Sequence, residues 1–183
     1  KLNKTDLIYK ILDDQATVEF VKRRADSHNM ARVFTYGAAT KGLRGKELAE
    51  IGLLSESGAL AFTDGIKAIS DARIMHKVLS YASTFNLLVV QHPEEESLSN
   101  GGVMNTGEMA TRLGLPGIPR EAEIIMLERD LRLVEMTDSR YHAAHISTSE
   151  SVEIITKAKK KGLKVTCDTS PFYFKLNELA VGD

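Results

Sequence analysis

The chain has 183 residues, of which 43% are hydrophobic and 27% charged, and its formal net charge is -1. This length suffices for one domain with a substantial core, and the near-zero charge argues against a nucleic-acid partner, which usually requires a basic surface. No segment approaches the roughly 18 consecutive apolar residues of a membrane span, and the first ten residues lack an apolar signal-peptide core. Because Cys167 is the only cysteine, no internal disulfide can form, which is typical of a reducing cytoplasm. We therefore expect a soluble cytoplasmic domain with no nucleic-acid or membrane partner.

Short, uniformly apolar segments alternate along the chain with longer amphipathic segments. The short segments do not alternate between apolar and polar residues, so they predict strands of a parallel sheet that is covered on both faces. In chain order, the expected elements are a helix over 13–29, a strand over 32–38, a helix over 45–58, a strand over 59–64, a helix over 70–86, a strand over 87–92, a helix over 120–138, a strand over 140–147, a helix over 147–163 and a strand over 163–168.

The helix expected over 120–138 has the most regular amphipathic pattern. Its spacing predicts four buried side chains, namely Ile125, Leu127, Leu131 and Val134. Gly58 and Gly162 follow two of the expected helices, where a glycine can adopt the left-handed conformation of a helix C-terminus. A Ser/Thr cap is expected where the helix over 147–163 begins.

Strand–helix alternation predicts a right-handed parallel α/β fold, either a doubly wound sheet or a (β/α)8 barrel. Both folds place their ligands at the carboxyl ends of the strands, where this chain carries Asp64, His92, His145 and Asp168. Two imidazoles and a carboxylate are ligands for a zinc-like ion. Each residue also has an ordinary structural explanation, because Asp-Gly is a common turn pair and a single strand-end histidine is more often hydrogen-bonded than metal-bound.

The remaining histidines and carboxylates favour structural explanations. His142 lies three residues before His145, so on a strand it faces the opposite side and is expected to pack or to support a ligand. Hydrogen bonding is the preferred explanation for Asp168, and His28 and His76 lie in expected helices. The glycine-containing segments lack the spacing of phosphate-binding loops, and no G-x-S-x-G nucleophile motif is present.

Two long segments resemble the middle of a class I dihydroorotase, a family of the amidohydrolase superfamily of metal-dependent (β/α)8 barrels. They are HPEEESLSNGGVMNTGEMATRLGLPGIPREAE over 92–123 and RYHAAHISTSESVEIITKAKKKGLKVTCDTSP over 140–171. SGALAFTDG over 57–65 and YGAATKGLRGKELAEIG over 36–52 resemble the preceding strands. The resemblance implies a partial (β/α)8 TIM-type barrel, about strands three to seven with their helices. Residues 1–183 are then expected to be the central part of the barrel domain, incomplete at both ends.

The resemblance also implies a metal site. Asp64 matches the metal-bridging carboxylate of the fourth strand, His92 the ligand on the fifth and His145 the ligand on the sixth. Hydantoinases usually carry a carboxylated lysine at the Asp64 position, so the aspartate favours dihydroorotase. The implied cofactor is one or two zinc ions, or another divalent metal. The family's first-strand His-x-His pair, its substrate-binding arginine and asparagine, and its eighth-strand catalytic aspartate have no counterpart in the chain, and TSPFYF over 169–174 replaces the TPHH of many relatives.

The function implied by the resemblance is the interconversion of dihydroorotate and N-carbamoyl-L-aspartate in de novo pyrimidine biosynthesis. The substrate is then a small molecule, and the expected partners are a second copy of the protein or aspartate transcarbamoylase. The isolated chain is expected to be inactive. Two alternatives are a non-catalytic scaffold subunit for aspartate transcarbamoylase and an allantoinase or hydantoinase. A flavodoxin-like binding domain would explain five strands but not the histidines at their ends.

Overall fold

Five parallel strands form the main sheet, in the order β1-β2-β3-β6-β7. A computed structural model describes residues 11–28, 31–65 and 67–182. The strands of the main sheet are β1 (Thr35–Ala38), β2 (Ala59–Thr63), β3 (Leu88–Gln91), β6 (Arg140–Ala143) and β7 (Val165–Cys167). Each lies within a strand expected from the apolar segments, although the strand expected over 140–147 ends at Ala143, and all neighbouring pairs are parallel. The expected α/β class with a parallel sheet is therefore confirmed.

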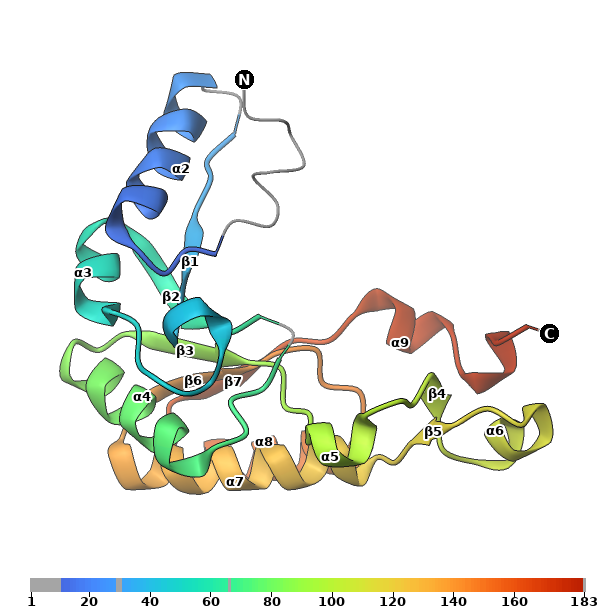
Figure 1. Cartoon of the computed structure of the whole chain (residues 1–183). Coiled ribbons are helices and arrows are strands. Elements are labelled where there is room, and N and C mark those ends of the chain that lie inside the picture. The colour runs from blue at the N-terminus through green and yellow to red at the C-terminus, as the bar shows by residue number, and fades with distance from the viewer. Residues whose placement is uncertain (1–10, 29–30, 66, 183) are drawn as a thin grey trace.

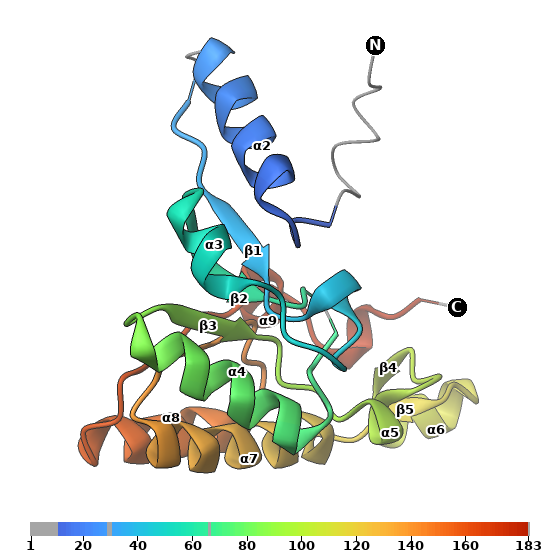
Figure 2. The ribbon, with the colours of Figure 1, turned by 60° about the vertical axis from the view of Figure 1, so that its left-hand side comes forward.

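Five helices lie in the expected regions and alternate with the strands, although the helix expected over 45–58 is helical only over 51–56. They are α2 (Gln15–His28), α3 (Ile51–Glu56), α4 (Ala72–Thr84), α7 (Glu121–Thr137) and α8 (Ser149–Lys160). Residue 29, at the end of the first expected helix, lies outside the described residues. Figure 1 shows α4, α7 and α8 along one face of the sheet, and Figure 2 shows α2 extending away from them.

Helix ends follow the local sequence signals. Thr148 caps α8, because its side chain accepts a hydrogen bond from the Ser151 amide, and this confirms the expected Ser/Thr cap. Asp71 caps α4 in the same way. Gly58 and Gly162 follow α3 and α8 with φ angles of 103° and 88°, a conformation that glycine adopts at little steric cost.

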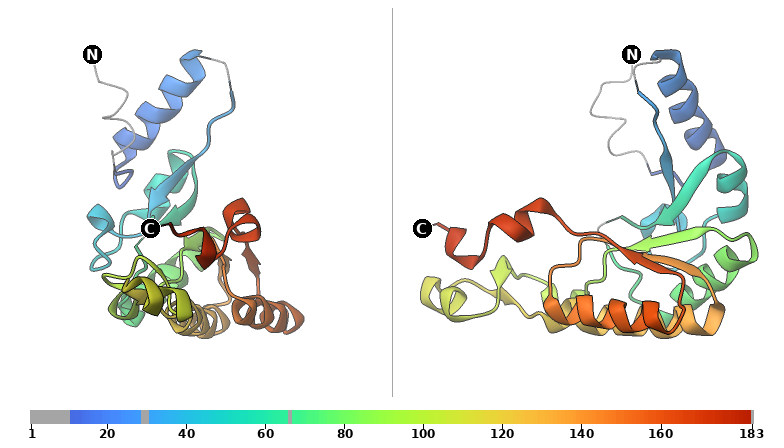
Figure 3. Two further views of the ribbon diagram at one scale, coloured as in Figure 1. Left: turned by 90° about the vertical axis from the view of Figure 1, so that its right-hand side faces the viewer. Right: turned by 180° about the vertical axis from the view of Figure 1, so that it is seen from behind.

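Between β3 and α7 the chain forms a small extension that the sequence patterns did not predict. It consists of α5 (Glu96–Ser99), β4 (Met104–Asn105), α6 (Glu108–Leu113) and β5 (Gly117–Ile118), and β4 pairs with β5 in a separate two-stranded sheet. The remaining short elements are η1 (Lys41–Leu43), α9 (Pro171–Lys175) and η2 (Glu178–Ala180). Figure 3 shows the extension and α9 at the same end of the main sheet, the end to which its strands point.

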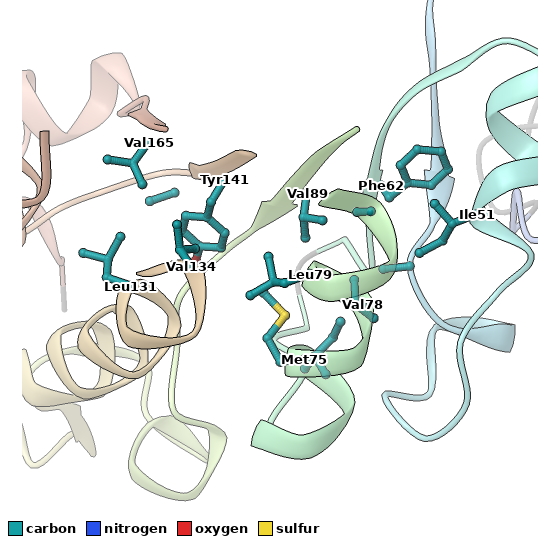
Figure 4. Packing of buried hydrophobic residues seen from close by; sticks show 14 of the residues in the cluster. Ile51, Phe62, Met75, Val78, Leu79, Val89, Leu131, Val134, Tyr141 and Val165 are labelled. Carbon is teal, nitrogen blue, oxygen red and sulfur yellow. The ribbon is translucent and has the colours of Figure 1, made fainter. Parts of the chain in front are cut away.

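The core lies between the sheet and the helices on its covered face. Phe62, Val89 and Tyr141, from three neighbouring strands, pack with Leu79 of α4 and Val134 of α7 (Figure 4). Burying such side chains contributes roughly 1.5–3 kcal/mol each. Tyr141 is the only one of the five with a polar atom on its side chain, and its hydroxyl is hydrogen-bonded.

The amphipathic pattern of α7 predicts three of its four buried residues correctly. Leu127, Leu131 and Val134 are buried, but Ile125 is 50% exposed, so that part of the prediction is wrong. The buried stripe of α7 instead includes Glu123 and Asp130. None of the helices in the described part of the chain is long and apolar enough to cross a membrane.

Candidate metal site at the carboxyl ends of the strands

His92 and His145 lie side by side at the carboxyl end of the sheet. Gln91 of β3 pairs with Ala143 of β6, so the residues that follow the two strands emerge together. The two imidazole centroids are 5.4 Å apart, with ring planes inclined at 55°. Both side chains line a cavity of about 500 Å³, which is also lined by Thr106, Ile118 and residues of the segment over 173–178. The structure therefore brings together the two histidines that the sequence singled out.

His145 has a backbone conformation unusual for a residue with a side chain. Its φ is 60°, in the left-handed region that few non-glycine residues adopt. The amide of His145 donates to Asp168 Oδ1 at 2.6 Å, and the next amide, of Ile146, donates to the Asp168 carbonyl at 2.9 Å. These contacts fix the turn and direct the imidazole into the cavity. Such conformations persist where the surrounding contacts determine them, and they cluster at functional sites.

His92 makes only long polar contacts. Its Nδ1 lies 3.5 Å from the Ala144 carbonyl, and its Nε2 lies 3.5 Å from Glu94 Oε2. Neither ring nitrogen of His92 makes a short hydrogen bond, so a ligand could bind there without breaking one. A histidine ligand often binds through one ring nitrogen while the other faces a carbonyl or carboxylate, and the surroundings of His92 offer both.

Asp64 lies apart from the two histidines. It lines a second cavity, of about 730 Å³, together with residues 42–46 and 67–71. Its Oδ1 accepts a hydrogen bond from the Thr40 amide at 2.8 Å, and its Oδ2 accepts one from the Thr40 hydroxyl. Burial raises the pKa of Asp64, and the Thr40 hydrogen bonds oppose that shift. Within residues 11–28, 31–65 and 67–182, no three His, Cys, Asp or Glu side chains are grouped so that they could hold a metal ion.

His142 and Asp168 form a hydrogen-bonded pair beside the site. His142 Nδ1 lies 2.7 Å from the Thr166 hydroxyl, and its Nε2 lies 3.0 Å from Asp168 Oδ2. Desolvation would raise the pKa of Asp168, but the His145 amide, the His142 imidazole and the charges of both rings together lower it. The expected structural hydrogen bonding of Asp168 is confirmed. His28 is exposed at the end of α2, and His76 is half-buried on α4.

The carboxylate of Asp130, on α7, is the centre of a buried hydrogen-bond network. It is fully buried and accepts from the Gln91 amide, from the Tyr141 hydroxyl at 2.8 Å and from Arg129 Nη2 at 2.6 Å. Gln91 Oε1 in turn accepts from the Ile69 amide at 2.7 Å. Burial raises the pKa of Asp130, an effect that the charge and hydrogen bonds of Arg129 oppose.

This network connects three strand ends. Arg129 also donates to the carbonyls of Ile69 and Ser70, at 2.8 and 2.7 Å, and so holds the loop that follows β2. Gln91 immediately precedes His92, and Tyr141 lies on the strand that leads to His145. Asp130 thus connects the segments that carry all three metal ligands implied by the sequence.

Glu123, in the first turn of α7, holds the loop that precedes α8. Its two carboxylate oxygens accept four hydrogen bonds, from the amides and hydroxyls of Ser147 and Thr148. Sequence patterns did not single out Glu123 or Asp130. One signal was available: both carboxylates fall on the same helical stripe as Leu127 and Val134, and a charged residue on an apolar stripe needs a buried partner.

An ion pair closes the rim of the histidine cavity. Arg120 Nη1 donates to Glu150 Oε1 at 2.7 Å, and both residues line the cavity. The hydrogen bond from Arg120, followed by those from the Glu150 amide and the Ser149 hydroxyl, lowers the pKa of Glu150 from 4.5 to about 2.

Comparison with known proteins identifies the family. The family model described as Dihydro-orotase-like matches residues 5–151. The chain belongs to the dihydroorotase-like family. It is 46% identical over 169 residues to a dihydroorotase of Syntrophotalea carbinolica, and 42% identical over 171 residues to one of Desulforapulum autotrophicum. These matches cover 92% and 93% of this chain and 40% of each relative, so the chain spans about two fifths of their length.

Solved structures of hydantoinases share the fold of this dihydroorotase-like chain. An L-hydantoinase of Arthrobacter aurescens superimposes with a TM-score of 0.67 at 20% identity, over 88% of this chain and 37% of the hydantoinase. A D-hydantoinase superimposes with a TM-score of 0.64 at 20% identity, over 97% of this chain and 39% of that protein. The expected partial (β/α)8 barrel is therefore confirmed, and the flavodoxin-like alternative is wrong.

Replacement of Asp130 tests how far the buried network stabilises the fold. We expect Asp130→Ala to lower the free energy of unfolding by about 3–5 kcal/mol, because it leaves Arg129, Gln91 and Tyr141 without their shared acceptor. Urea denaturation monitored by circular dichroism measures the change. Glu128→Ala, on the exposed side of the same helix, is the control and should change stability by no more than about 0.5 kcal/mol. Equal stabilities of the two variants would contradict the structural role of the network.

The pKa of Glu150 tests the rim ion pair. We expect Arg120→Met to raise this pKa from about 2 toward 4.5, whereas Arg112→Met, on exposed α6, should leave it unchanged. Because the pKa is lowered in the folded state, the stabilisation is present above pH 4.5 and is lost as the pH falls toward 2. Carbon-13 NMR titration of the glutamate carboxyl groups measures both pKa values. An ordinary pKa for Glu150 in the unsubstituted chain would show that the ion pair does not persist in solution.

Proposed function

We propose that this chain contributes the metal-binding centre of a dihydroorotase, which interconverts dihydroorotate and N-carbamoyl-L-aspartate in cytoplasmic de novo pyrimidine biosynthesis. The observation that carries the proposal is the pair of neighbouring imidazoles, His92 and His145, at the carboxyl ends of adjacent strands in a dihydroorotase-like fold. In (β/α)8 barrels this face is where catalytic residues are found. The relatives named dihydroorotase, at 42% and 46% identity, support the same reaction.

The two imidazoles fit the requirements of a divalent metal. Neutral histidine nitrogens suit zinc, and other divalent ions accept the same donors, so we propose one or two zinc ions as the cofactor. Asp64 is the proposed carboxylate ligand. Its carboxylate lines the separate cavity of about 730 Å³ and is hydrogen-bonded by Thr40, so this assignment rests on the family resemblance.

The chemistry divides between the metal and the residues of the chain. A bound divalent ion would lower the pKa of a water molecule and polarise an amide carbonyl. His92 and His145 would hold the ion, while Asp168, through the His145 amide, orients the second of these ligands. The cavity beside them, about 500 Å³, is within the range of sites for small molecules, which matches a substrate the size of dihydroorotate.

The chain supplies part of the barrel only. It spans about two fifths of the dihydroorotases that it matches, and its main sheet has five strands, whereas a complete barrel has eight. We propose that residues 1–183 form the central part of the barrel domain and that the remaining ligands and the proton-transferring group lie on other strands.

Exposed aromatic side chains favour a protein partner as well. Phe172 and Phe174, on α9, are 69% and 84% exposed, and clustered apolar surface commonly marks an interface. A second copy of the protein and aspartate transcarbamoylase are the proposed partners. A non-catalytic scaffold role would need this surface but not the paired imidazoles.

Metal binding by the chain tests the proposed centre directly. We expect zinc to bind with micromolar affinity, measured by calorimetry, and we expect the double variant His92→Ala, His145→Ala to lose this binding, since both nitrogen ligands are removed. His28→Ala, on the exposed end of α2, is the control and should bind as the unsubstituted chain does. Asp64→Asn in the same titration tests the third ligand. Binding that survives the double substitution would contradict the assignment of both histidines.

The reaction is tested on a complete barrel and on the isolated chain. We expect the 183-residue chain to be inactive with dihydroorotate, because it provides three of the implied ligands at most. A barrel completed with the remaining strands of a dihydroorotase relative should hydrolyse dihydroorotate, and His145→Ala should reduce kcat/KM by at least about 100-fold, as expected when a metal ligand is lost. A barrel that hydrolyses allantoin or a hydantoin instead would assign the chain to one of those enzymes.

A further inference from the structure

We infer that Glu123 is a positioning residue that holds the turn carrying His145, and that α7 sets the relative positions of the two imidazoles. The inference rests on the proposed metal site, because it concerns the placement of two of the proposed ligands. Glu123 itself lies on α7 and belongs to none of the strands that carry them.

Glu123 is bound more completely than a surface carboxylate would be. Its Oε2 accepts from the Ser147 amide at 2.9 Å and from the Ser147 hydroxyl at 2.6 Å. Its Oε1 accepts from the Thr148 amide at 3.1 Å and from the Thr148 hydroxyl at 2.8 Å. Only 9% of the residue is exposed, and among the described residues no cationic side chain forms an ion pair with it. Its charge is therefore compensated by these four donors and by the positive end of α8.

The donors to Glu123 complete the anchoring of the whole turn. Five consecutive amides, from Ala144 to Thr148, each have a partner outside the turn: the Ala144 amide donates to the Gln91 carbonyl at 2.9 Å, the next two donate to Asp168, and the last two donate to Glu123. His145 lies within this run with its left-handed φ of 60°. With both flanks of His145 fixed, its backbone has little freedom to return to an ordinary conformation.

Helix capping does not account for Glu123. The cap of α8 is provided by the Thr148 hydroxyl, which accepts from the Ser151 amide. Ser147 precedes the helix, and its amide and hydroxyl both bind Glu123. The contacts of Glu123 therefore attach the turn to α7, beyond what is needed to begin α8.

The same helix fixes the other imidazole. Asp130 lies seven residues after Glu123, which is two helical turns or about 10 Å along the axis. Asp130 accepts from Gln91, the residue immediately before His92. One rigid helix thus holds the segment of His145 with one carboxylate and the segment of His92 with another, so the separation of the imidazoles depends on α7.

The test combines two measurements on the full chain, with zinc as the only added ligand. The first is the metal-free NMR spectrum of the histidine imidazoles, and the second is calorimetric zinc affinity. In Glu123→Gln the carboxamide replaces one acceptor oxygen with a donor, so at least two of the four hydrogen bonds are lost. Glu121→Gln, exposed in the same helical turn, is the matched control. Ser147→Ala removes one bond and is the milder variant if Glu123→Gln does not fold.

We expect Glu123→Gln to displace the His145 imidazole resonances, to leave those of His28 in place and to weaken zinc binding by about 10-fold, as outer-shell substitutions commonly do. Ser147→Ala should change both quantities in the same direction by less, and Glu121→Gln should change neither. Displaced His145 resonances in a chain that does not bind zinc would support the positioning role of Glu123 and reject the proposed metal site.

Two results would overturn the inference. Coincident His145 resonances in Glu123→Gln and in the unsubstituted chain would show that the carboxylate does not position the imidazole. Equal displacement of the His145 resonances in Glu123→Gln and in the Glu121→Gln control would show that the effect does not come from the contacts of Glu123 with Ser147 and Thr148.

Discussion

The buried carboxylate of Asp130 is the contact on which the arrangement of this sheet depends. A carboxylate with no exposure is costly unless it is fully hydrogen-bonded, and Asp130 meets that requirement only if Gln91, Tyr141 and Arg129 all reach it. Those partners come from β3, β6 and the neighbouring position of α7. The free-energy cost of burying one charge therefore selects a single register of helix against sheet.

Specific geometry at the strand ends follows from that register. Gln91 uses both ends of its amide, donating to Asp130 and accepting from the Ile69 amide, so the loop after β2 is tied to the strand that precedes His92. At the adjacent strand end, Asp168 and Glu123 bind the amides around His145. Apolar packing alone could not specify these positions, because hydrophobic contact is non-directional.

Hydrophobic patterning predicts the repeating architecture of this chain. All five strands and all five long helices were predictable, since each has a continuous apolar segment or an amphipathic stripe, and the rule that ligands gather at the carboxyl ends of strands correctly paired His92 with His145. The extension over 96–118 consists of elements of two to six residues, which are too short to show a period; α3 is equally short but lies within the longer segment over 45–58 that predicted it. The burial of Ile125 was predicted wrongly. The apolar stripe of a helix can be wider than the surface that its neighbours cover, and Ile125 lies outside the covered part.

Long-range polar contacts account for what the sequence did not predict about the site. Asp64 was expected beside the histidines, but the conformation of the loop over 40–45 places Thr40 against its carboxylate. The roles of Glu123 and Asp130 depend on partners 24 and 39 residues away. No local pattern records such pairings, and a single sequence contains only the weak signal of a charge on an apolar stripe.

The sequence separation between these hydrogen-bonded residues also affects how the protein folds. Arg129 binds the Ile69 carbonyl across 60 residues, and Gln91 binds Asp130 across 39. Closing such long loops costs entropy before the contact is formed, and non-local contacts of this kind slow folding. We therefore expect the helices and the inner strands to associate first and the polar cluster to close last. The proposed metal site would then be completed in the final stage of folding, and partly folded chains would lack it.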